Sequence, residues 1–235
     1  MLKFLSRLIL APLARLIFRP RIIGKTNVPK SGPVLIASNH LSFIDSVVIT
    51  LVAPRSVSFL AKSSYFTGTG FRGWVSRVFF TSIGAIPVER GAGHAAQDAL
   101  DSGLRVLRSG GAFAIYPEGT RSLDGRIYKG RTGVAWLALT SGAPVVPVAL
   151  TGTENLQPVG SRWPRLVRVT VEFGGPLDLG AHGRADSGRA RRKATDQVMD
   201  TIQRMSGQVA AGVYNEPPPT VSERVRRVFR NPWRR

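Results

Sequence analysis

The sequence predicts an α/β protein with a mainly parallel central sheet and helices on both faces, preceded by an amphipathic helix at a membrane interface. Three observations predict this fold. Short apolar runs alternate with helix-like stretches through residues 34–150, as in strands that are joined by crossover helices. Several runs are continuously apolar, which is typical of strands buried on both faces. The first 23 residues place leucine and isoleucine at helical spacing among basic residues.

The amino-terminal segment, residues 1–23, is predicted to lie on a membrane surface. Lys3, Arg7 and Arg15 stand between its apolar residues. In such a helix the apolar side enters the lipid, and the basic side chains reach the headgroups. A signal peptide and a helix packed on the domain are the alternatives, because Leu8–Ala14 is a short apolar core behind basic residues.

Residues 24–212 are predicted to form the α/β domain. The carboxyl ends of parallel strands share one edge of the sheet, and ligands bind there. Polar residues follow each apolar run, so we expect His40, Lys62, Arg90, Glu118 and Arg121 to converge at this edge. The predicted strands are Val34–Ser38, Val57–Ala61, Ile83–Val88, Ala112–Tyr116 and Val145–Leu150, and the predicted helices are Phe43–Val52, Phe71–Phe80, Ala95–Leu107 and Thr132–Thr140.

The carboxyl-terminal part is predicted to complete the domain and to add a tail. Leu166–Phe173 alternates apolar and polar residues, as an edge strand with one wet face does. A basic, glycine-rich loop and a surface helix over Ala194–Ala211 follow it. Residues 213–235 read as a proline-rich and then basic tail, either disordered or in contact with the membrane.

The composition limits the partners. The net charge of +19 calls for an anionic partner, namely nucleic acid, an anionic membrane face or a phosphorylated substrate. Three short stretches, residues 1–23, 184–193 and 216–235, hold 13 of the 19 excess charges. The chain has no cysteine, which excludes disulfides and thiolate nucleophiles, and no residues stand at metal-ligand spacing. We therefore expect no metal and no bound cofactor.

The first candidate site is the pair His40 and Asp45. If the first strand ends before His40 and a helix begins near Ser42, the histidine lies in the connecting loop and can meet the carboxylate. An imidazole held by a carboxylate keeps one tautomer and can accept a proton from an alcohol. The alternative is a capping box of Ser42 and Asp45 beside an ordinary loop histidine.

The second candidate site is the stretch Tyr116–Ser122. Gly119 lets backbone amides approach an anion, and the guanidinium of Arg121 suits a phosphate monoester. Lys62 and Arg90 would extend this basic lining. The alternative is a surface turn with an ion pair of Glu118 and Arg121. A glycine-rich stretch at residues 68–73 matches the spacing of a dinucleotide-binding motif, but it begins too far after its strand, and we interpret it as a flexible loop.

Taken together, these motifs resemble the glycerolipid acyltransferases, specifically the 1-acyl-sn-glycerol-3-phosphate acyltransferase (lysophosphatidic acid acyltransferase) family. The resemblance covers about residues 24–173 and rests on Asn-His-x-Ser-x-x-Asp at 39–45, Gly-Ala-Ile-Pro-Val-Glu-Arg at 84–90, Tyr-Pro-Glu-Gly-Thr-Arg-Ser at 116–122 and Val-Val-Pro-Val-Ala-Leu at 145–150. It implies acyl transfer from a coenzyme A or acyl carrier protein thioester to the free hydroxyl of a lysophospholipid. His40 would be the base and Asp45 its orienting carboxylate. The acceptor phosphate would be bound by Glu118, Gly119, Thr120, Arg121, Lys62 and Arg90.

The sequence thus predicts an acyltransferase that makes phosphatidic acid from 1-acyl-sn-glycerol-3-phosphate. It would work at the cytoplasmic side of the cell membrane as a peripheral or monotopic protein, with no nucleic-acid partner. Within the same chemistry, the alternatives are another lysolipid, a lyso-ornithine lipid or a glycolipid as acceptor. A non-enzymatic basic module that binds membrane or nucleic acid is the alternative from another class, although the chain carries no motif that reads nucleic acid.

Overall fold

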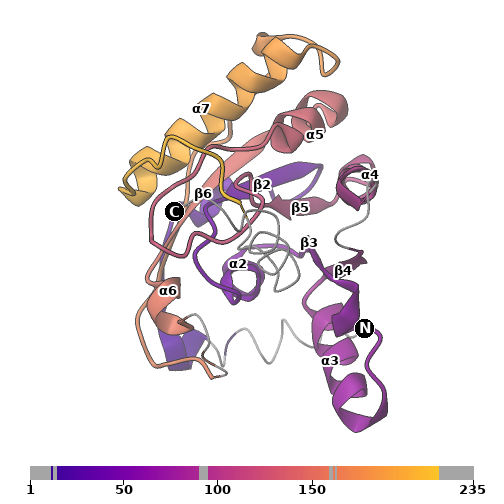
Figure 1. Ribbon diagram of the computed structural model, residues 1–235, viewed down its shortest axis with the longest axis vertical. Helices are drawn as coiled ribbons and strands as arrows, with labels where there is room; N and C mark the ends of the chain where they lie inside the picture. Colours follow the sequence, from indigo (N-terminus) through magenta and orange to yellow (C-terminus); the bar gives the residue numbers. More distant parts are fainter. Residues whose placement is uncertain (1–11, 13–14, 90–94, 159–160, 162, 217–235) are drawn as a thin grey trace, which may run out of the picture.

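The computed structural model describes residues 12, 15–89, 95–158, 161 and 163–216 of the chain. In this part seven strands form one sheet in the order β1-β7-β6-β2-β5-β3-β4 (Figure 1). The strands from β6 to β4 are parallel, whereas β7 is antiparallel to β6 and parallel to β1. The predicted α/β fold with a mainly parallel sheet is confirmed. The strands are β1 (Arg21–Ile23), β2 (Val34–Ser38), β3 (Val57–Lys62), β4 (Ala85–Val88), β5 (Ala112–Ile115), β6 (Val145–Thr151) and β7 (Thr170–Phe173).

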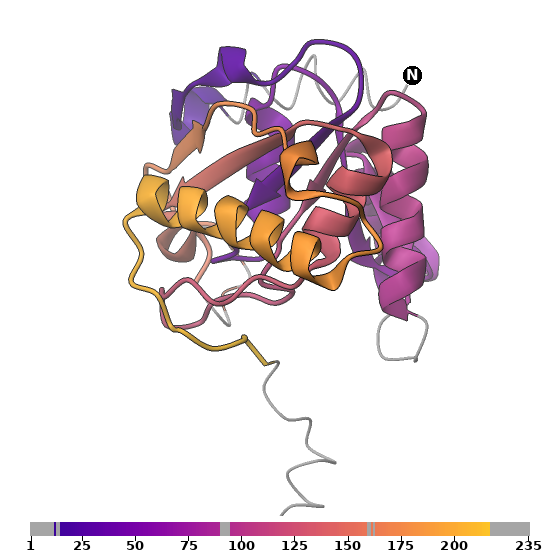
Figure 2. The same cartoon turned by 90° about the horizontal axis from the view of Figure 1, so that it is seen from above.

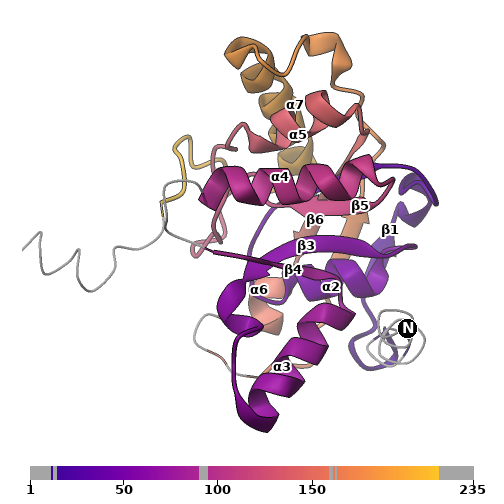
Figure 3. The same ribbon diagram turned by 90° about the vertical axis from the view of Figure 1, so that its right-hand side faces the viewer.

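Helices cover both faces of the sheet, as the sequence predicts. The helices α4, α5 and α7 lie on one side of the sheet, and α2, α3 and α6 lie on the other (Figure 3). Seen from above, α7 extends across the face of the sheet beside α5 (Figure 2). The helices are α2 (Asp45–Val52), α3 (Gly70–Ser82), α4 (Ala95–Arg108), α5 (Gly133–Ser141), α6 (Thr153–Leu156) and α7 (Gly188–Ser206), with 3-10 turns η1 (Lys25–Asn27), η2 (Ser63–Tyr65) and η3 (Gly180–His182).

The central strand β2 explains why its sequence is apolar at every position. Successive side chains of a strand point to opposite faces, and here both faces are covered. Val34 and Ile36 enter the core beneath α2 and α3, whereas Leu35 and Ala37 enter the core beneath α4, α5 and α7. All five residues of β2 are buried. The strand therefore holds its carboxyl end, and the residues that follow, on a rigid base.

One sequence prediction about the far side of the sheet was wrong. β7 was expected at the edge, but β1 pairs with it and forms the edge itself. β1 comprises residues 21–23, which the sequence assigns to the amino-terminal segment. A three-residue strand gives too short an apolar pattern to detect, and long-range pairing with β7 decides it.

The amino-terminal segment lies mostly outside the described residues, so its predicted interfacial helix stays a prediction. Where it is described, the side chain of Arg15 donates a hydrogen bond to the carbonyl of Leu51 in α2 at 2.6 Å. Leu16 and Ile17 are exposed. Within the described ranges, no helix has the length and apolar character that a bilayer crossing requires.

Three element boundaries differ from the prediction for local reasons. α7 begins at Gly188 because the Ser187 hydroxyl caps it by accepting the amide of Ala190 at 3.2 Å, and it ends at Ser206, followed by Gly207 in the left-handed region. The stretch at residues 68–73, expected to be a flexible loop, instead contains the first turn of α3. Ser42 does not cap α2; the cap position is Ile44 and has no side-chain cap bond.

Candidate active site

The loop between β2 and α2, residues 39–44, is called here the histidine loop. Its first residue, Asn39, is fully buried, and its carboxamide pairs with the backbone of Leu150 in β6. The Asn39 nitrogen donates to the Leu150 carbonyl at 2.9 Å, and the Leu150 amide donates to the Asn39 oxygen at 2.8 Å. These bonds continue the β2–β6 pairing beyond the last strand residue. They fix the position from which His40 leaves the sheet.

His40 and Asp45 meet as predicted. The Nδ1 atom of His40 lies 2.8 Å from Oδ2 of Asp45, the first residue of α2. The same oxygen accepts the backbone amides of Leu41 at 2.7 Å and Ser42 at 2.9 Å. The Asp45 side chain is completely buried, and the His40 side chain is 17% exposed. A carboxylate at Nδ1 favours a proton on that nitrogen, so the lone pair lies on Nε2.

The capping box that was the alternative interpretation is only half present. Asp45 accepts the amide of Ser42, as a capping box requires. The Ser42 hydroxyl, however, donates to the carbonyl of Gln157 at 2.8 Å and does not accept a backbone amide of the helix. The carboxylate thus serves both the loop backbone and the imidazole.

Tyr116 supports the imidazole from one face. The two rings stack with centroids 3.9 Å apart and planes 12° apart, and the Tyr116 hydroxyl shares a 2.8 Å hydrogen bond with Ser46 of α2. Burial raises the pKa of the Tyr116 hydroxyl well above its ordinary value, and the charge of Asp45 adds to this. The phenol therefore stays neutral. Sequence reasoning assigned Tyr116 no role, because only the fold brings it against His40.

Glu118 joins the histidine loop to the loop that follows β5. Its side chain is completely buried, with one oxygen 3.1 Å from the amide of His40 and the other 2.9 Å from the amide of Tyr128. Burial raises the pKa of this carboxyl to about 7, although both amide hydrogen bonds act in the opposite direction. Both oxygens thus accept backbone amides inside the protein.

The loop after β5, residues 116–122, is called here the β5 loop. It turns at Gly119, whose φ of +80° favours glycine. A Cβ there would lie 3.0 Å from Nε of Arg131, so the arginine side chain passes directly over this turn. The amide of Ser122 donates to the carbonyl of His40 at 2.7 Å. The two loops are therefore linked on both sides of His40, and Thr120 and Arg121 lie in the turn between the links.

Residues 207–215, called here the carboxyl-terminal strap, lie alongside the β5 loop and the residues that continue it up to 131. Asn215 donates to the carbonyls of Thr120 at 3.4 Å and Arg121 at 3.0 Å, and its own carbonyl accepts from Arg131 at 3.3 Å. Further along, Val213 accepts the amide of Lys129 at 2.9 Å. The sequence assigns residues 213–215 to the tail, and in the structure Val213 and Asn215 bond to residues 120–131 of the domain.

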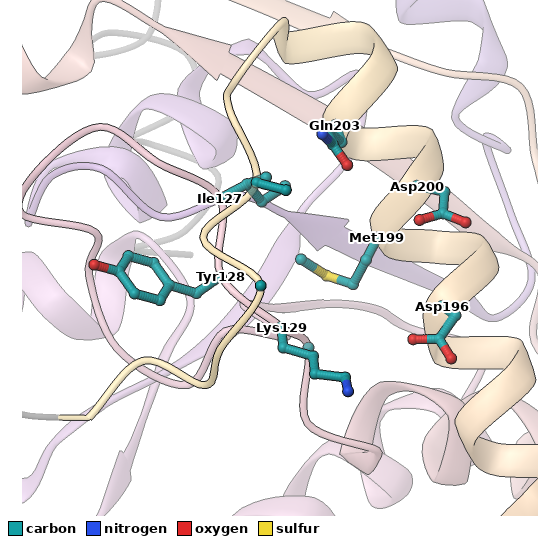
Figure 4. A pocket seen from close by; sticks show the side chains of 10 residues that line it. Ile127, Tyr128, Lys129, Asp196, Met199, Asp200 and Gln203 are labelled. Carbon is teal, nitrogen blue, oxygen red and sulfur yellow. The ribbon is translucent and has the colours of Figure 1, made fainter.

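A hollow of about 150 Å³ lies behind this loop system (Figure 4). It is lined by residues 127–130, by α7 and by the strap, with Met199, Asp196, Asp200 and Lys129 around it. Its lining includes no residue of the histidine loop or of the stretch 116–122, so the hollow is separate from His40.

The remaining predicted residues lie less centrally. Lys62 is exposed at the end of β3, two strands from β2, which corresponds to roughly 10 Å across the sheet. Arg90 lies outside the described residues. Within the part of the chain that the structure describes, no three His, Asp or Glu side chains gather in a way that could hold a metal ion.

A protein-family model named Acyltransferase matches residues 19–151, which contain β2, β5 and both loops. The chain belongs to this acyltransferase family. Its match is also supported by a solved structure, the 1-acyl-sn-glycerophosphate acyltransferase PlsC from Thermotoga maritima. The two chains are 25% identical with a TM-score of 0.62, and the similarity covers 87% of this chain and 79% of that one. The carboxyl-terminal strap lies beyond the residues that the family model matches.

Relatives with named activities point in the same direction. The chloroplastic 1-acyl-sn-glycerol-3-phosphate acyltransferase of Brassica napus is 32% identical over 145 residues, which are 61% of this chain and 40% of that protein. The enzyme of the same name from Borreliella burgdorferi is 30% identical over 139 residues, 57% of this chain and 52% of that protein. The chain thus spans about two fifths of the plant relative and half of the bacterial one.

Proposed function

We propose that the protein transfers a fatty acyl group from an acyl thioester to the free hydroxyl of 1-acyl-sn-glycerol-3-phosphate, giving phosphatidic acid. The observation that carries the proposal is the 2.8 Å contact between His40 Nδ1 and the buried carboxylate of Asp45. It leaves the lone pair on Nε2 of a fixed imidazole whose side chain is partly exposed. The names of the relatives supply the acceptor.

His40 acts as the general base. As the acceptor oxygen attacks the thioester carbonyl, Nε2 takes its proton, and Asp45 stabilises the imidazolium that forms. The tetrahedral intermediate then collapses: the C–S bond breaks, the ester C–O bond remains, and the imidazolium returns its proton to the thiolate. A base in this position contributes roughly 10² to 10⁴ in rate. The thioester is already activated, so the chemistry requires no cofactor.

The β5 loop is proposed to bind the acceptor phosphate through Gly119, Thr120 and Arg121, with Lys62 and Arg90 beside it. Arg121 can form a bidentate contact with a phosphate monoester. For Glu118 we propose a supporting role instead of a phosphate contact, because both of its oxygens accept backbone amides and its side chain is fully buried. A carboxylate in this position also avoids repulsion with the phosphate, since it faces inward.

Both substrates are amphiphiles that carry phosphate, so we propose that the protein works at the anionic, cytoplasmic face of the cell membrane as a peripheral or monotopic enzyme. Coenzyme A and acyl carrier protein are both suitable carriers of the acyl thioester. The net charge of +19 favours an anionic surface and anionic substrates alike.

The test is product formation by mass spectrometry, with palmitoyl- and oleoyl-coenzyme A as donors and a panel of lysolipid acceptors that includes lysophosphatidic acid. Wild type and His40→Ala are compared. We expect phosphatidic acid from the wild type and a loss of roughly 10³-fold in kcat for His40→Ala. His182→Ala, on η3 away from the histidine loop, is the matched control and should keep wild-type activity.

Other outcomes separate the alternatives. Transfer only to a different lysolipid, a lyso-ornithine lipid or a glycolipid would keep the mechanism and replace the acceptor. Transfer only from acyl carrier protein would assign the donor. No transfer from either donor to any acceptor would contradict the proposal and favour a non-enzymatic basic module.

A further inference from the structure

The helix α3 shows an apolar surface on the side that faces away from the protein. Its inner side is anchored by buried Phe80, by a hydrogen bond of 2.7 Å from the Ser76 hydroxyl to the carbonyl of Tyr65, and by Gly73. A Cβ at Gly73 would overlap the carbonyl of Gly68, so only glycine permits this close approach. These contacts fix which side of α3 points outward.

The outward side carries large apolar residues. Phe71 is 76% exposed, Trp74 54%, Val75 43% and Phe79 37%. At about 100° per residue these four positions and Val78 share an arc of about 140° opposite the anchored side. Phe71 and Trp74 stack on each other with centroids 5.9 Å apart. A surface helix normally directs its apolar stripe to the core of the protein. In α3 these apolar residues face outward instead.

The charges on α3 specify the kind of partner. Arg72 and Arg77, both exposed, stand on the two borders of the apolar arc, and the helix contains no acidic residue. An apolar face with arginines along its borders is the arrangement by which a helix lies in the interface of an anionic bilayer: the aromatic rings enter the acyl boundary and the guanidiniums contact phosphate headgroups.

Ring contacts link the apolar face of α3 to the histidine loop. Phe79 contacts Phe80 with centroids 5.4 Å apart, and Phe80 stacks on Tyr65 at 4.6 Å. Phe43, which belongs to the histidine loop and is 40% exposed, lies 5.7 Å from Tyr65 and 6.4 Å from Phe80. An aromatic cluster therefore connects α3 to the loop that carries His40. Figure 3 shows α3 projecting from the sheet on the same side as α2.

We infer that the outer face of α3 docks on an anionic lipid surface and brings the histidine loop to the membrane. This places a membrane contact within the catalytic domain, separate from the predicted helix of residues 1–23. The inference rests on the proposed function only where it says that docking brings the catalytic loop to its substrates. The docking itself requires no enzymatic activity.

The test measures binding of the full chain to vesicles of equal parts phosphatidylglycerol and phosphatidylcholine by cosedimentation. The double variant F71S/W74S removes the apolar face, and we expect its binding constant to fall at least roughly tenfold. The matched control is W163S/L166S, which removes two apolar side chains that are 79% exposed elsewhere; it should bind within about twofold of wild type. Equal binding of the two double variants would overturn the inference.

The arginines of α3 allow an independent test of the inference. R72Q/R77Q changes exposed side chains only, and we expect roughly tenfold weaker binding to the anionic vesicles and no change with pure phosphatidylcholine. Thermal unfolding is compared for all variants. If F71S/W74S proves to be unfolded, the vesicle binding of R72Q/R77Q tests the inference instead. Binding of R72Q/R77Q as tight as that of the wild type would overturn the inference. A dimer of the wild type in sedimentation velocity that F71S/W74S abolishes would instead assign the face to a second copy of the chain.

Activity separates this inference from the proposed function. F71S/W74S should lose transfer to lysophosphatidic acid in vesicles and keep transfer to a short-chain lysophosphatidic acid that is dissolved as monomers. If the wild type acylates neither acceptor, the proposed function fails, whereas the vesicle-binding result still decides the role of α3.

Discussion

The histidine loop and the β5 loop follow neighbouring parallel strands, but they are held in different ways. The His40 side chain is oriented by a residue close in the sequence, since Asp45 binds the imidazole and two amides of the loop, while Asn39 and Ser42 anchor the loop to Leu150 and Gln157. The β5 loop carries no such local pair and is held by contacts with distant residues: its own Glu118 accepts the amide of His40, and Asn215 donates to the carbonyls of Thr120 and Arg121. One loop presents a reactive side chain, and the other presents a turn whose shape depends on the rest of the domain.

This difference suggests that the histidine loop carries the chemistry and that the contacts of the β5 loop support the shape of the site. If the histidine loop performs the proton transfer, changes in it should reduce kcat without altering the fold greatly. If the β5 loop depends on distant contacts, changes in its supports should reduce stability or acceptor affinity. Each of the following experiments examines one side of this comparison.

The largest effect is expected for Asp45→Asn. The amide keeps the shape of the carboxylate but cannot stabilise an imidazolium or favour the proton on Nδ1, so kcat should fall roughly 10² to 10⁴-fold. Steady-state kinetics with a vesicle-bound acceptor measures this. Asp98→Asn, exposed in the first turn of α4, is the control. A kcat within twofold of wild type for Asp45→Asn would show that the pair is structural.

Glu118→Ala should act mainly on stability. It leaves the buried amides of His40 and Tyr128 without their acceptor, at about 1–3 kcal/mol for each. We expect the free energy of unfolding in denaturant to fall by about 2–6 kcal/mol. Glu89→Ala, at an exposed position after β4, should change it by less than about 0.5 kcal/mol. Similar values for the two variants would contradict the supporting role.

The pH dependence of stability should reveal Glu118 as well. Its pKa is about 7 in the folded protein against an ordinary value of 4.5, so the folded state holds a proton that the unfolded state has released between these values. Stability from this group is therefore complete below pH 4.5 and is lost as the pH rises to 7, by about 3 kcal/mol. Glu118→Gln cannot titrate.

Denaturant unfolding of wild type and Glu118→Gln at pH 5 and pH 8 measures this effect. The wild type should lose more free energy of unfolding than the variant over this interval. Parallel losses in the two proteins would mean that Glu118 does not titrate with a raised pKa.

The smallest effect is expected for Asn215→Ala. Loss of its bonds to the carbonyls of Thr120 and Arg121 should loosen the β5 loop and raise the KM for the acceptor roughly two- to tenfold, with kcat within about twofold. Val213→Ala is the matched control, because its strap hydrogen bond uses only the backbone. An unchanged KM for Asn215→Ala would restrict the strap to a packing role.

Different parts of the site were predictable to different degrees. The partner of His40 was found because it lies five residues along the chain, where a loop and a helix start limit the possible geometry. The supporting contacts of Tyr116 and Asn215 had no comparable signal. Stacking on an imidazole and bonds to a carbonyl 94 residues away leave no local pattern in a single sequence.

The sequence by itself determined the alternation of strands and helices, the parallel sheet and the edge at which the polar residues gather. Hydrophobic periodicity is a local property that reveals each strand and helix. Because crossover connections between parallel strands are right-handed, these elements can form few sheet topologies. Only the tertiary structure decided that Glu118 faces inward, that β1 forms the sheet edge, that residues 207–215 support the β5 loop and that α3 presents its apolar side to the outside. Each of these depends on contacts between residues that are distant in the sequence, and such contacts form only when the helices and strands pack together.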